Sequence, residues 1–250
     1  MITKETFLGC CFVSTIVELV ASRGVALEVG SDFSVFEKAL KTQPERNVLA
    51  PKFDPRTNDL GEGTAFWILG RDPYGEVVHT QAVQMIDLEG STLASYLEKR
   101  FCDFVPAGHR IDAERSRYCP APGSRAIAGR VCYHGELWLK GGPGGYRGAG
   151  MTAVLARLAM VLALMRWSPD YVFGFMFPLA ACRGLAAREG YMHTEPGSIY
   201  WAVPQRAEAL EEWAVWMSRE DIRHILQIPP DNLFALLEEG RLQARSDKAA

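Results

Sequence analysis

The chain has 250 residues, of which 48% are hydrophobic and 23% are charged, and its formal net charge is −3. This composition is that of an ordinary globular protein that buries a sizeable core. A mildly acidic chain lacks the basic surface that nucleic-acid binding requires, so we expect no nucleic-acid partner. The six cysteines include no Cys-x-x-Cys pair, which predicts reduced thiols in a cytoplasmic protein and no metal site.

The apolar stretch near the N-terminus predicts a helix that packs in the core or at an interface. Its uncharged run from Phe7 to Val17 is much shorter than the roughly 20 residues that a membrane span needs. The stretch also lacks the basic start and the small-residue cleavage site of a signal peptide. We therefore expect no membrane span.

The next part of the chain predicts two strands, over residues 64–72 and 76–87. They are joined by an Asp-Pro-Tyr-Gly turn and are rich in residues that favour strands. Residues 91–105 have apolar side chains at helical spacing, with Ser91 as the N-cap. Residues 106–129 are rich in proline and glycine, which predicts an irregular segment.

Strands and helices then alternate, which predicts a mixed α/β domain. Serine and proline at 168–169 end the long helix, because the residue before a proline avoids the helical region. The predicted elements are strands over 130–139, 171–177 and 198–204, and helices over 148–167, 178–191 and 206–217.

A glycine-rich loop leads into the long helix. Six of the twelve residues from Gly141 to Thr152 are glycine, and Arg147 lies among them. Glycines let a phosphate approach the free N–H groups of a helix start, and an arginine adds a charge-assisted contact. The pattern therefore predicts a pyrophosphate site. It is neither a P-loop nor a dinucleotide fingerprint, because the required lysine and third glycine are missing; the alternative is a connector with no ligand.

The hexapeptide RGAGMT resembles the acyl-CoA-binding motif of the GNAT N-acyltransferase superfamily, although Thr152 stands where Gly or Ala is usual. The segment GLAAREGY, residues 184–191, is similar to the end of the next helix in that family. The resemblance covers about residues 65–205. It implies a GNAT-like mixed, mostly antiparallel sheet with a splayed central strand pair, flanked by helices. It also implies that acetyl-CoA or a longer acyl-CoA is held by Trp138, Leu139, Arg147, Gly148, Ala149, Gly150, Met151 and Thr152.

The resemblance also implies candidate catalytic residues. Glu136 occupies a position where many relatives carry a strand carboxylate near the thioester, which suits a general base for the amine; the alternative is a solvent-facing edge residue. Strand alternation would place His134 on the same face, as a second candidate or a structural histidine. Relatives often carry a tyrosine acid where this chain has Ala186, so Tyr191 or Tyr133 would replace it, or the thiolate would leave unaided.

A second, shorter segment is similar to another signature. AERSRY, residues 113–118, resembles the Glu-x-Ser-Arg-Phe signature of acyl-homoserine-lactone synthases, which have the GNAT fold. It implies that Glu114, Ser116 and Arg117 bind a larger, amino-acid-like acceptor in a pocket built by an insertion over about residues 88–130. The alternative is a surface loop with an ion pair.

The last part of the chain resembles the small helix-turn-helix of excisionase-type proteins. Its predicted recognition helix, DNLFALLEE, is acidic and lacks the side chains that reach bases. We therefore expect a GNAT-like domain over residues 1–216 and a packing or dimerisation appendage over 217–250, with a homodimer as one expectation.

The expected function is transfer of an acyl group from acyl-CoA, or from an acyl-carrier protein, to a small-molecule amine. The alternatives are an acyl-homoserine-lactone or N-acyl amino acid synthase and a catalytically silent acyl-CoA-binding regulatory protein.

Overall fold

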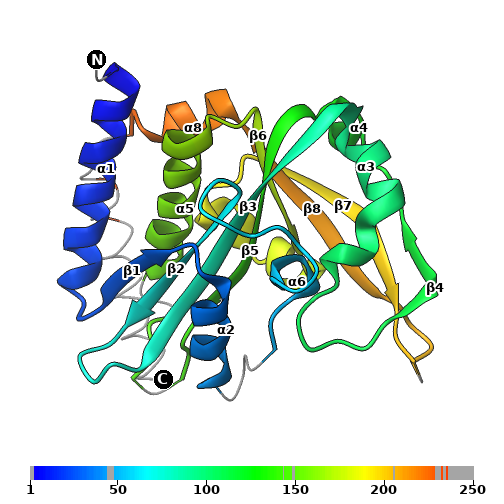
Figure 1. Cartoon of the computed structure of the whole chain (residues 1–250), viewed down its shortest axis with the longest axis horizontal. Coiled ribbons are helices and arrows are strands. Elements are labelled where there is room, and N and C mark those ends of the chain that lie inside the picture. The colour runs from blue at the N-terminus through cyan, green and yellow to red at the C-terminus, as the bar shows by residue number, and fades with distance from the viewer. Residues whose placement is uncertain are drawn as a thin grey trace.

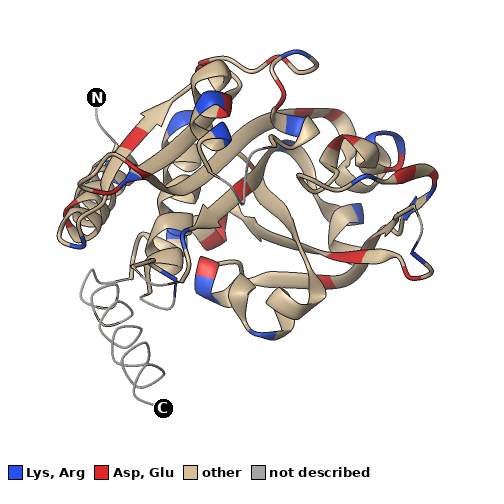
Figure 2. Cartoon of the chain, turned by 90° about the horizontal axis from the view of Figure 1, so that it is seen from below, with Lys and Arg blue, Asp and Glu red and all other residues tan. Residues whose placement is uncertain are grey.

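A single mixed sheet with helices on both faces forms the body of the protein (Figure 1, and turned by 90° in Figure 2). The computed structural model describes residues 3–43, 48–142, 144–147, 150–204 and 206–228, with residues 232 and 235. The strands are β1 (Ala26–Gly30), β2 (Ala65–Arg71), β3 (Val77–Thr92), β4 (Asp112–Tyr118), β5 (Ala128–Leu139), β6 (Tyr171–Met176), β7 (His193–Ala202) and β8 (Leu210–Ser218). The α-helices are α1 (Lys4–Ala21), α2 (Phe33–Lys41), α3 (Leu93–Arg100), α4 (Pro122–Ala126), α5 (Met151–Trp167), α6 (Pro178–Cys182), α7 (Leu185–Glu189) and α8 (Arg219–Ile225), and two 3-10 turns are η1 (Pro51–Phe53) and η2 (Phe101–Phe104).

The strands lie in the order β1-β2-β3-β5-β6-β8-β7-β4. Neighbouring strands are antiparallel except for β5 and β6, which are parallel. A parallel pair needs a crossover connection, and α5 provides it between β5 and β6. The predicted mixed, mostly antiparallel sheet is therefore confirmed.

Helix α5 is the centre of the layer on one face of the sheet, together with α1 and α8. Its buried residues occur on nearly every side of the helix, because it packs against β3 and β5 beneath it and against α1, α7 and α8 around it. At its C-terminal end, Ser168 takes a left-handed conformation with φ of 45°, and Pro169 follows. The predicted end of this helix is confirmed.

The other face is covered by α2, η1, α3 and η2, which bury an aromatic cluster against the sheet. Phe53 of η1 stacks on Tyr133 of β5 with ring centroids 5.4 Å apart, and Phe104 of η2 meets the same ring edge-on at 4.7 Å. These contacts fix both 3-10 turns over the middle of β5.

Three predicted elements differ from the structure. The helix expected over 206–217 is wrong, because this segment forms β8 between β6 and β7. The segment expected to be irregular over 106–129 contains β4 and α4. The helix expected over 178–191 is divided into α6 and α7, since Gly184 between them has a left-handed φ of 75°. The N-cap of α3 is Thr92 rather than Ser91.

The expected boundary after residue 216 falls inside β8. Helix α8 follows directly, and its residues Ile222 and Ile225 are buried in the main core beside α5. The predicted helix-turn-helix segment begins at Met217 and therefore includes α8, whereas its acidic recognition helix, residues 231–239, lies outside the described residues apart from isolated positions. Within the described part of the chain, no helix has the length and apolarity needed to cross a membrane.

Candidate active site

The parallel strands β5 and β6 diverge part of the way along their length. Their pairing ends at Tyr133 and Phe173, whereas β5 continues to Leu139 and β6 to Met176. The backbone groups of β5 beyond Tyr133 are therefore not paired with β6. This divergence is the splayed strand pair that the resemblance implied.

A bulge shapes β5 just after the divergence begins. Thr80 pairs with Trp138 while Ala82 pairs with Gly135, so two residues of β5 face one residue of β3. Glu136 lies in the bulge with a φ of 55°, a left-handed conformation that few residues other than glycine adopt. The Thr80 hydroxyl donates to the Glu136 carbonyl at 2.8 Å and stabilises this geometry. Such backbone conformations cluster at functional sites.

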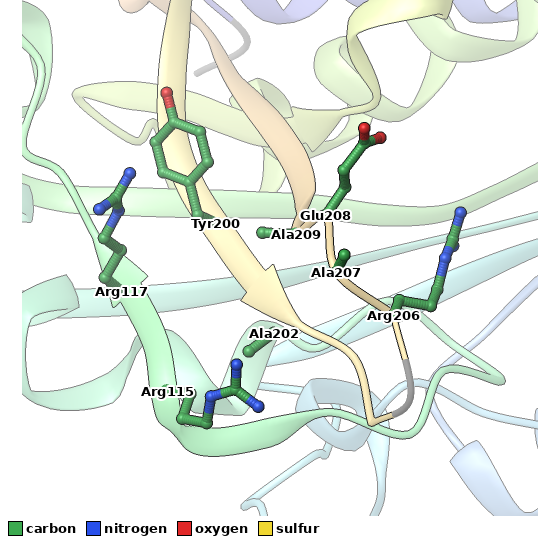
Figure 3. Close-up of a pocket in the computed structure, with 8 residues that line it drawn as sticks. All are labelled: Arg115, Arg117, Tyr200, Ala202, Arg206, Ala207, Glu208 and Ala209. Atoms are coloured by element: carbon green, nitrogen blue, oxygen red, sulfur yellow. The ribbon is translucent and has the colours of Figure 1, made fainter.

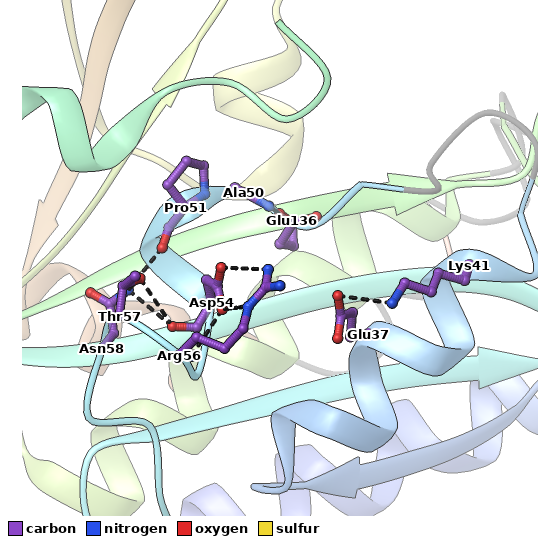
Figure 4. Close-up of polar contacts among 9 residues, drawn as sticks. All are labelled: Glu37, Lys41, Ala50, Pro51, Asp54, Arg56, Thr57, Asn58 and Glu136. Carbon is purple, nitrogen blue, oxygen red and sulfur yellow. Dashed lines mark hydrogen bonds and ion pairs between the residues drawn. The ribbon is translucent and has the colours of Figure 1, made fainter.

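The Glu136 side chain is buried, with 7% of its surface exposed. Its Oε1 accepts a hydrogen bond from the backbone N–H of Ala50 at 2.7 Å (Figure 4). Ala50 precedes η1, so the carboxylate is held on the sheet face that α2, η1 and η2 cover.

The segment after η1 is braced by its own polar contacts (Figure 4). Arg56 donates to both carboxylate oxygens of Asp54 at 2.8 and 2.7 Å, and these bonds lower the pKa of that carboxyl. The Asn58 side chain donates to the Pro51 carbonyl at 2.8 Å. This network holds the turn that presents the Ala50 N–H to Glu136.

His134 does not lie on the same face as Glu136, and that expectation is wrong. The His134 ring contacts Tyr191 and Gln81 on the α5 side of the sheet, whereas Glu136 contacts Ala50 on the opposite side. Simple alternation fails because the left-handed residue in the bulge turns the Glu136 side chain away from its period-two direction.

A buried hydrogen-bonded chain runs through His134. Its Nδ1 lies 2.9 Å from the Tyr191 hydroxyl and its Nε2 lies 3.0 Å from Gln81 Oε1, while Gln81 Nε2 donates to the Leu155 carbonyl of α5. Burial lowers the pKa of His134 to about 4 and raises the pKa of Tyr191 well above its ordinary value. Gly174 of β6 leaves no room for a side chain, because a Cβ would lie 2.9 Å from the backbone carbonyl oxygen of His134 and 3.1 Å from the Tyr191 hydroxyl. His134 and Tyr191 are therefore both neutral near pH 7. The series of hydrogen bonds through His134 and Gln81 links β5 to α5.

The N-terminus of α5 lies at the end of the glycine-rich loop. Gly150, its N-cap, has a φ of 73° and no side chain that could cap the helix. A helix start of this kind presents N–H groups that lack α-helical partners, together with the positive end of the helix dipole; of these groups, the Ala153 N–H donates to the Gly150 carbonyl at 3.0 Å. Met151 is buried and Thr152 is half-buried in the first turn. Gly148 and Ala149, also predicted to contact the ligand, lie outside the described residues.

Arg147 connects this loop to the diverging strand. Its Nε donates to the Leu139 carbonyl, the last residue of β5, at 2.6 Å. Leu139 and Trp138 are both buried, and among the described residues the Trp138 indole N–H has no hydrogen-bond partner. The structure thus brings Trp138, Leu139, Arg147 and the start of α5 together at one end of β5.

The three predicted acceptor residues are not part of this group. Glu114, Ser116 and Arg117 lie on β4, the edge strand of the sheet. Three strands separate β4 from β5, which corresponds to roughly 20 Å along the sheet. The Ser116 hydroxyl donates to the Asp112 carbonyl and accepts from the Ala202 N–H, so it joins β4 to β7.

Lys52 could not be selected from the sequence, because no motif or periodic pattern includes it. It is 4% exposed, its Nζ donates to the Tyr96 hydroxyl at 3.2 Å, and it lies 5.2 Å from the centre of the Phe104 ring. Burial lowers the pKa of its ammonium to about 8, although the Asp103 carboxylate opposes this shift. Lys52 belongs to η1, so the turn that positions Ala50 beside Glu136 also carries a buried cation.

No group of three or more His, Cys, Asp or Glu side chains suited to a metal ion occurs in the part of the chain that the structure describes. The candidate site thus consists of the buried Glu136 carboxylate, the diverging strands β5 and β6, and the start of α5.

In comparisons with known proteins, the chain is similar to solved structures but not to any family model or curated sequence. A spermidine N-acetyltransferase SpeG variant from Vibrio cholerae is 7% identical, with a TM-score of 0.43 over 80% of this chain and 97% of that one. Aminoglycoside acetyltransferase AAC(6')-Ib in complex with coenzyme A and kanamycin is 12% identical, with a TM-score of 0.40 over 80% and 98%. TofI in a ternary complex with an inhibitor and MTA is 13% identical, with a TM-score of 0.40 over 82% and 98%.

Proposed function

We propose that the protein is an acyltransferase that moves an acyl group from acyl-CoA to a small-molecule amine. The observation that carries the proposal is the meeting of three features at one end of β5. These are a strand that diverges from its parallel neighbour, a helix start free of side-chain caps, and a buried carboxylate in a strand bulge.

The start of α5 is the proposed site for the pyrophosphate of coenzyme A. The N–H groups of Met151 and Thr152 and the side chain of Arg147 would provide donors and positive charge, and Gly150 leaves room for a phosphate to approach the backbone. The Nε bond of Arg147 to Leu139 aims this side chain along the end of β5, and its two other nitrogens can contact a phosphate. When bound there, acyl-CoA would supply a thioester that is open to attack by an amine.

Glu136 is the proposed general base. An amine attacks only as the free base, so its proton must pass to a nearby acceptor, directly or through one water. The Ala50 N–H holds one carboxylate oxygen in place, and the bulge aims the side chain toward the face covered by η1 and η2. The acceptor amine would therefore approach from that face.

His134 and Tyr191 have a positioning role in this proposal. Both ring nitrogens of His134 already have partners, and Tyr191 is bound to one of them. Together with Gln81 they hold β5 at a fixed distance from α5, which keeps the carboxylate and the start of the helix in one geometry. A hydroxyl acid is absent at Ala186, so the thiolate would leave without help from that position.

The test is a coupled assay of free thiol release. Acetyl-CoA, longer acyl-CoA thioesters and an acyl-carrier protein thioester would each be offered with polyamines, amino acids and aminoglycosides, and products would be identified by mass spectrometry. We expect saturable, acceptor-dependent thiol release with at least one pair. Binding of coenzyme A without release with any acceptor would favour the catalytically silent regulatory protein, for which the alanine at 186 is the supporting observation.

A second candidate, an N-acyl amino acid synthase, is favoured by Lys52. Among the described residues, the buried ammonium of Lys52 donates one hydrogen bond, to the neutral hydroxyl of Tyr96, and such a group is suited to an acceptor that carries a carboxylate. Acyl transfer to amino acids but not to polyamines would support this candidate.

A further inference from the structure

A cavity of about 220 Å³ lies at the edge of the sheet where β4 pairs with β7. Three arginines and a tyrosine line it, with one glutamate. Figure 3 shows Arg115 and Arg117 on β4 at one side of β7, and Arg206 and Glu208 at the other side in the connection to β8, with Tyr200 on β7.

Arg117 is held in place at the cavity wall. Its guanidinium lies 4.6 Å from the centre of the Tyr200 ring, and the two residues face each other in the strand register. This cation–π contact fixes the direction of a long side chain and leaves its N–H donors to bind other groups. Arg115 lies two positions earlier on the same strand and lines the same cavity.

The cavity has an excess of positive charge. Three arginines against one glutamate leave two net positive charges around it. Among the described residues, no carboxylate forms an ion pair with Arg115, Arg117 or Arg206. Glu211, which faces Tyr200 from β8, uses its Oε1 to accept from the Gly197 N–H and the Trp213 indole.

We propose that this cavity binds a phosphate dianion, either free or as the phosphate of a small monoester. A dianion matches the two net positive charges. A guanidinium group can also donate two parallel N–H···O hydrogen bonds to the oxygens of one phosphate. The volume is below the range of about 300–1,000 Å³ that is usual for whole drug-sized ligands, so the cavity fits the phosphate and a few further atoms. Because three strands separate β4 from β5, this site is distinct from the proposed acyl-transfer site.

The test is isothermal titration with inorganic phosphate and with glycerol 3-phosphate at constant ionic strength. Saturable binding of one equivalent is expected, and the tighter of the two probes identifies the free ion or the monoester as the ligand. The double variant Arg115→Ala/Arg117→Ala should weaken binding at least tenfold. Glu208→Gln should strengthen binding, because it removes the one negative charge from the wall.

The matched control is Arg125→Ala, which removes one exposed arginine that does not line the cavity. It should leave phosphate affinity unchanged, and circular dichroism should show that every variant is folded. Absence of saturable binding up to tens of millimolar, or an equal loss in the control, would overturn the proposal. A loss of coenzyme A affinity in the double variant, with phosphate binding unchanged, would also overturn it and would assign these arginines to the acyl donor.

Discussion

The carboxylate of Glu136 and the backbone N–H of Ala50 are joined by a 2.7 Å hydrogen bond, although 86 positions separate them in the chain. This bond attaches η1 to the bulge of β5. Because η1 also carries Lys52 and the stacked Phe53, a single short turn sets the surroundings of the candidate base. The relationship explains why the site depends on a segment far from the motif-bearing part of the chain.

Glu136→Gln should abolish most of the acyl transfer while leaving the fold intact. The amide oxygen can still accept from the Ala50 N–H, but the side chain cannot take a proton. Loss of a positioned general base should lower kcat/KM by roughly 10²–10⁴-fold. Steady-state kinetics with the best acceptor would measure this, alongside titration of coenzyme A, whose affinity should be nearly unchanged.

The matched control for that variant is Glu76→Gln, an exposed carboxylate that pairs with Lys140. Its kcat/KM should equal that of the wild type. If Glu136→Gln retained the wild-type rate, Glu136 would have a structural role and the proton would leave by another route.

Arg147→Ala should weaken coenzyme A binding at least tenfold, since one charge-assisted contact to a phosphate contributes about 1.5–3 kcal/mol. The loss of the bond to Leu139 affects a partly buried carbonyl at the strand end, so we expect a folded variant. Calorimetric titration with coenzyme A measures the effect, and Arg125→Ala is the control of equal charge. Equal affinities for the variant and the wild type would remove the pyrophosphate assignment.

His134 should make the protein sensitive to acid. Burial lowers its pKa from 6.5 to about 4, so the unfolded chain takes up a proton more readily than the folded protein. The stabilisation from neutral His134 is therefore complete above pH 6.5 and is lost as the pH falls to about 4, a change of about 3 kcal/mol. Urea denaturation at pH 7 and pH 4.5 would measure the free energy of unfolding of the wild type and of His134→Gln. Between these two pH values it should fall further for the wild type than for the variant.

The wild type must be compared with His134→Gln, because two buried glutamates stabilise the folded state as the pH falls, which is opposite to the effect of His134. Burial raises the pKa of Glu189 to about 8 and that of Glu212 to about 7. Their contributions are largest below pH 4.5 and decrease as the pH rises, and they cancel in the difference. The exposed His109→Gln is the control. If the free energy of unfolding fell equally in the wild type and in His134→Gln, the conclusion that His134 is buried and neutral would be contradicted.

Lys52→Met should stabilise the protein at pH 7. Burial lowers the pKa of Lys52 from 10.5 to about 8, so below pH 8 the folded state holds an unfavourable buried cation. The gain should be about 2 kcal/mol after loss of the bond to Tyr96 is included. It should decrease between pH 8 and pH 10.5, where the wild-type amine loses its proton in the folded state first.

Chemical denaturation at pH 7 and pH 10 would measure this effect, with the exposed Lys41→Met as control. If Lys52→Met were less stable than the wild type at pH 7, the stabilisation from the Lys52 contacts to Tyr96 and Phe104 would exceed the free-energy cost of burying its ammonium. In the kinetic assay, a raised KM for amino acid acceptors alone would support the second candidate function.

The features that depend on neighbouring residues in the chain could be predicted from the sequence. The buried strand, the glycine-rich loop, the long helix and the strand after it could all be predicted, because apolar periodicity, glycine and proline act locally. The mixed, mostly antiparallel sheet and its splayed strand pair followed from the resemblance that this order of elements carries, and the structure has both. Arg147 and Gly150 could be selected for the same reason.

The remaining features depend on contacts between distant parts of the chain. Residues 210–218 have the local preference of a helix, yet they pair as β8 with β6 and β7, because two ladders satisfy the backbone and override a weak propensity. The bulge at Glu136 reverses the face that alternation assigns to it. Lys52 becomes a buried cation, and Ala50 a partner of Glu136, only when η1 packs on β5. Contacts of this kind join residues far apart in the chain, so no local pattern in the sequence could specify them.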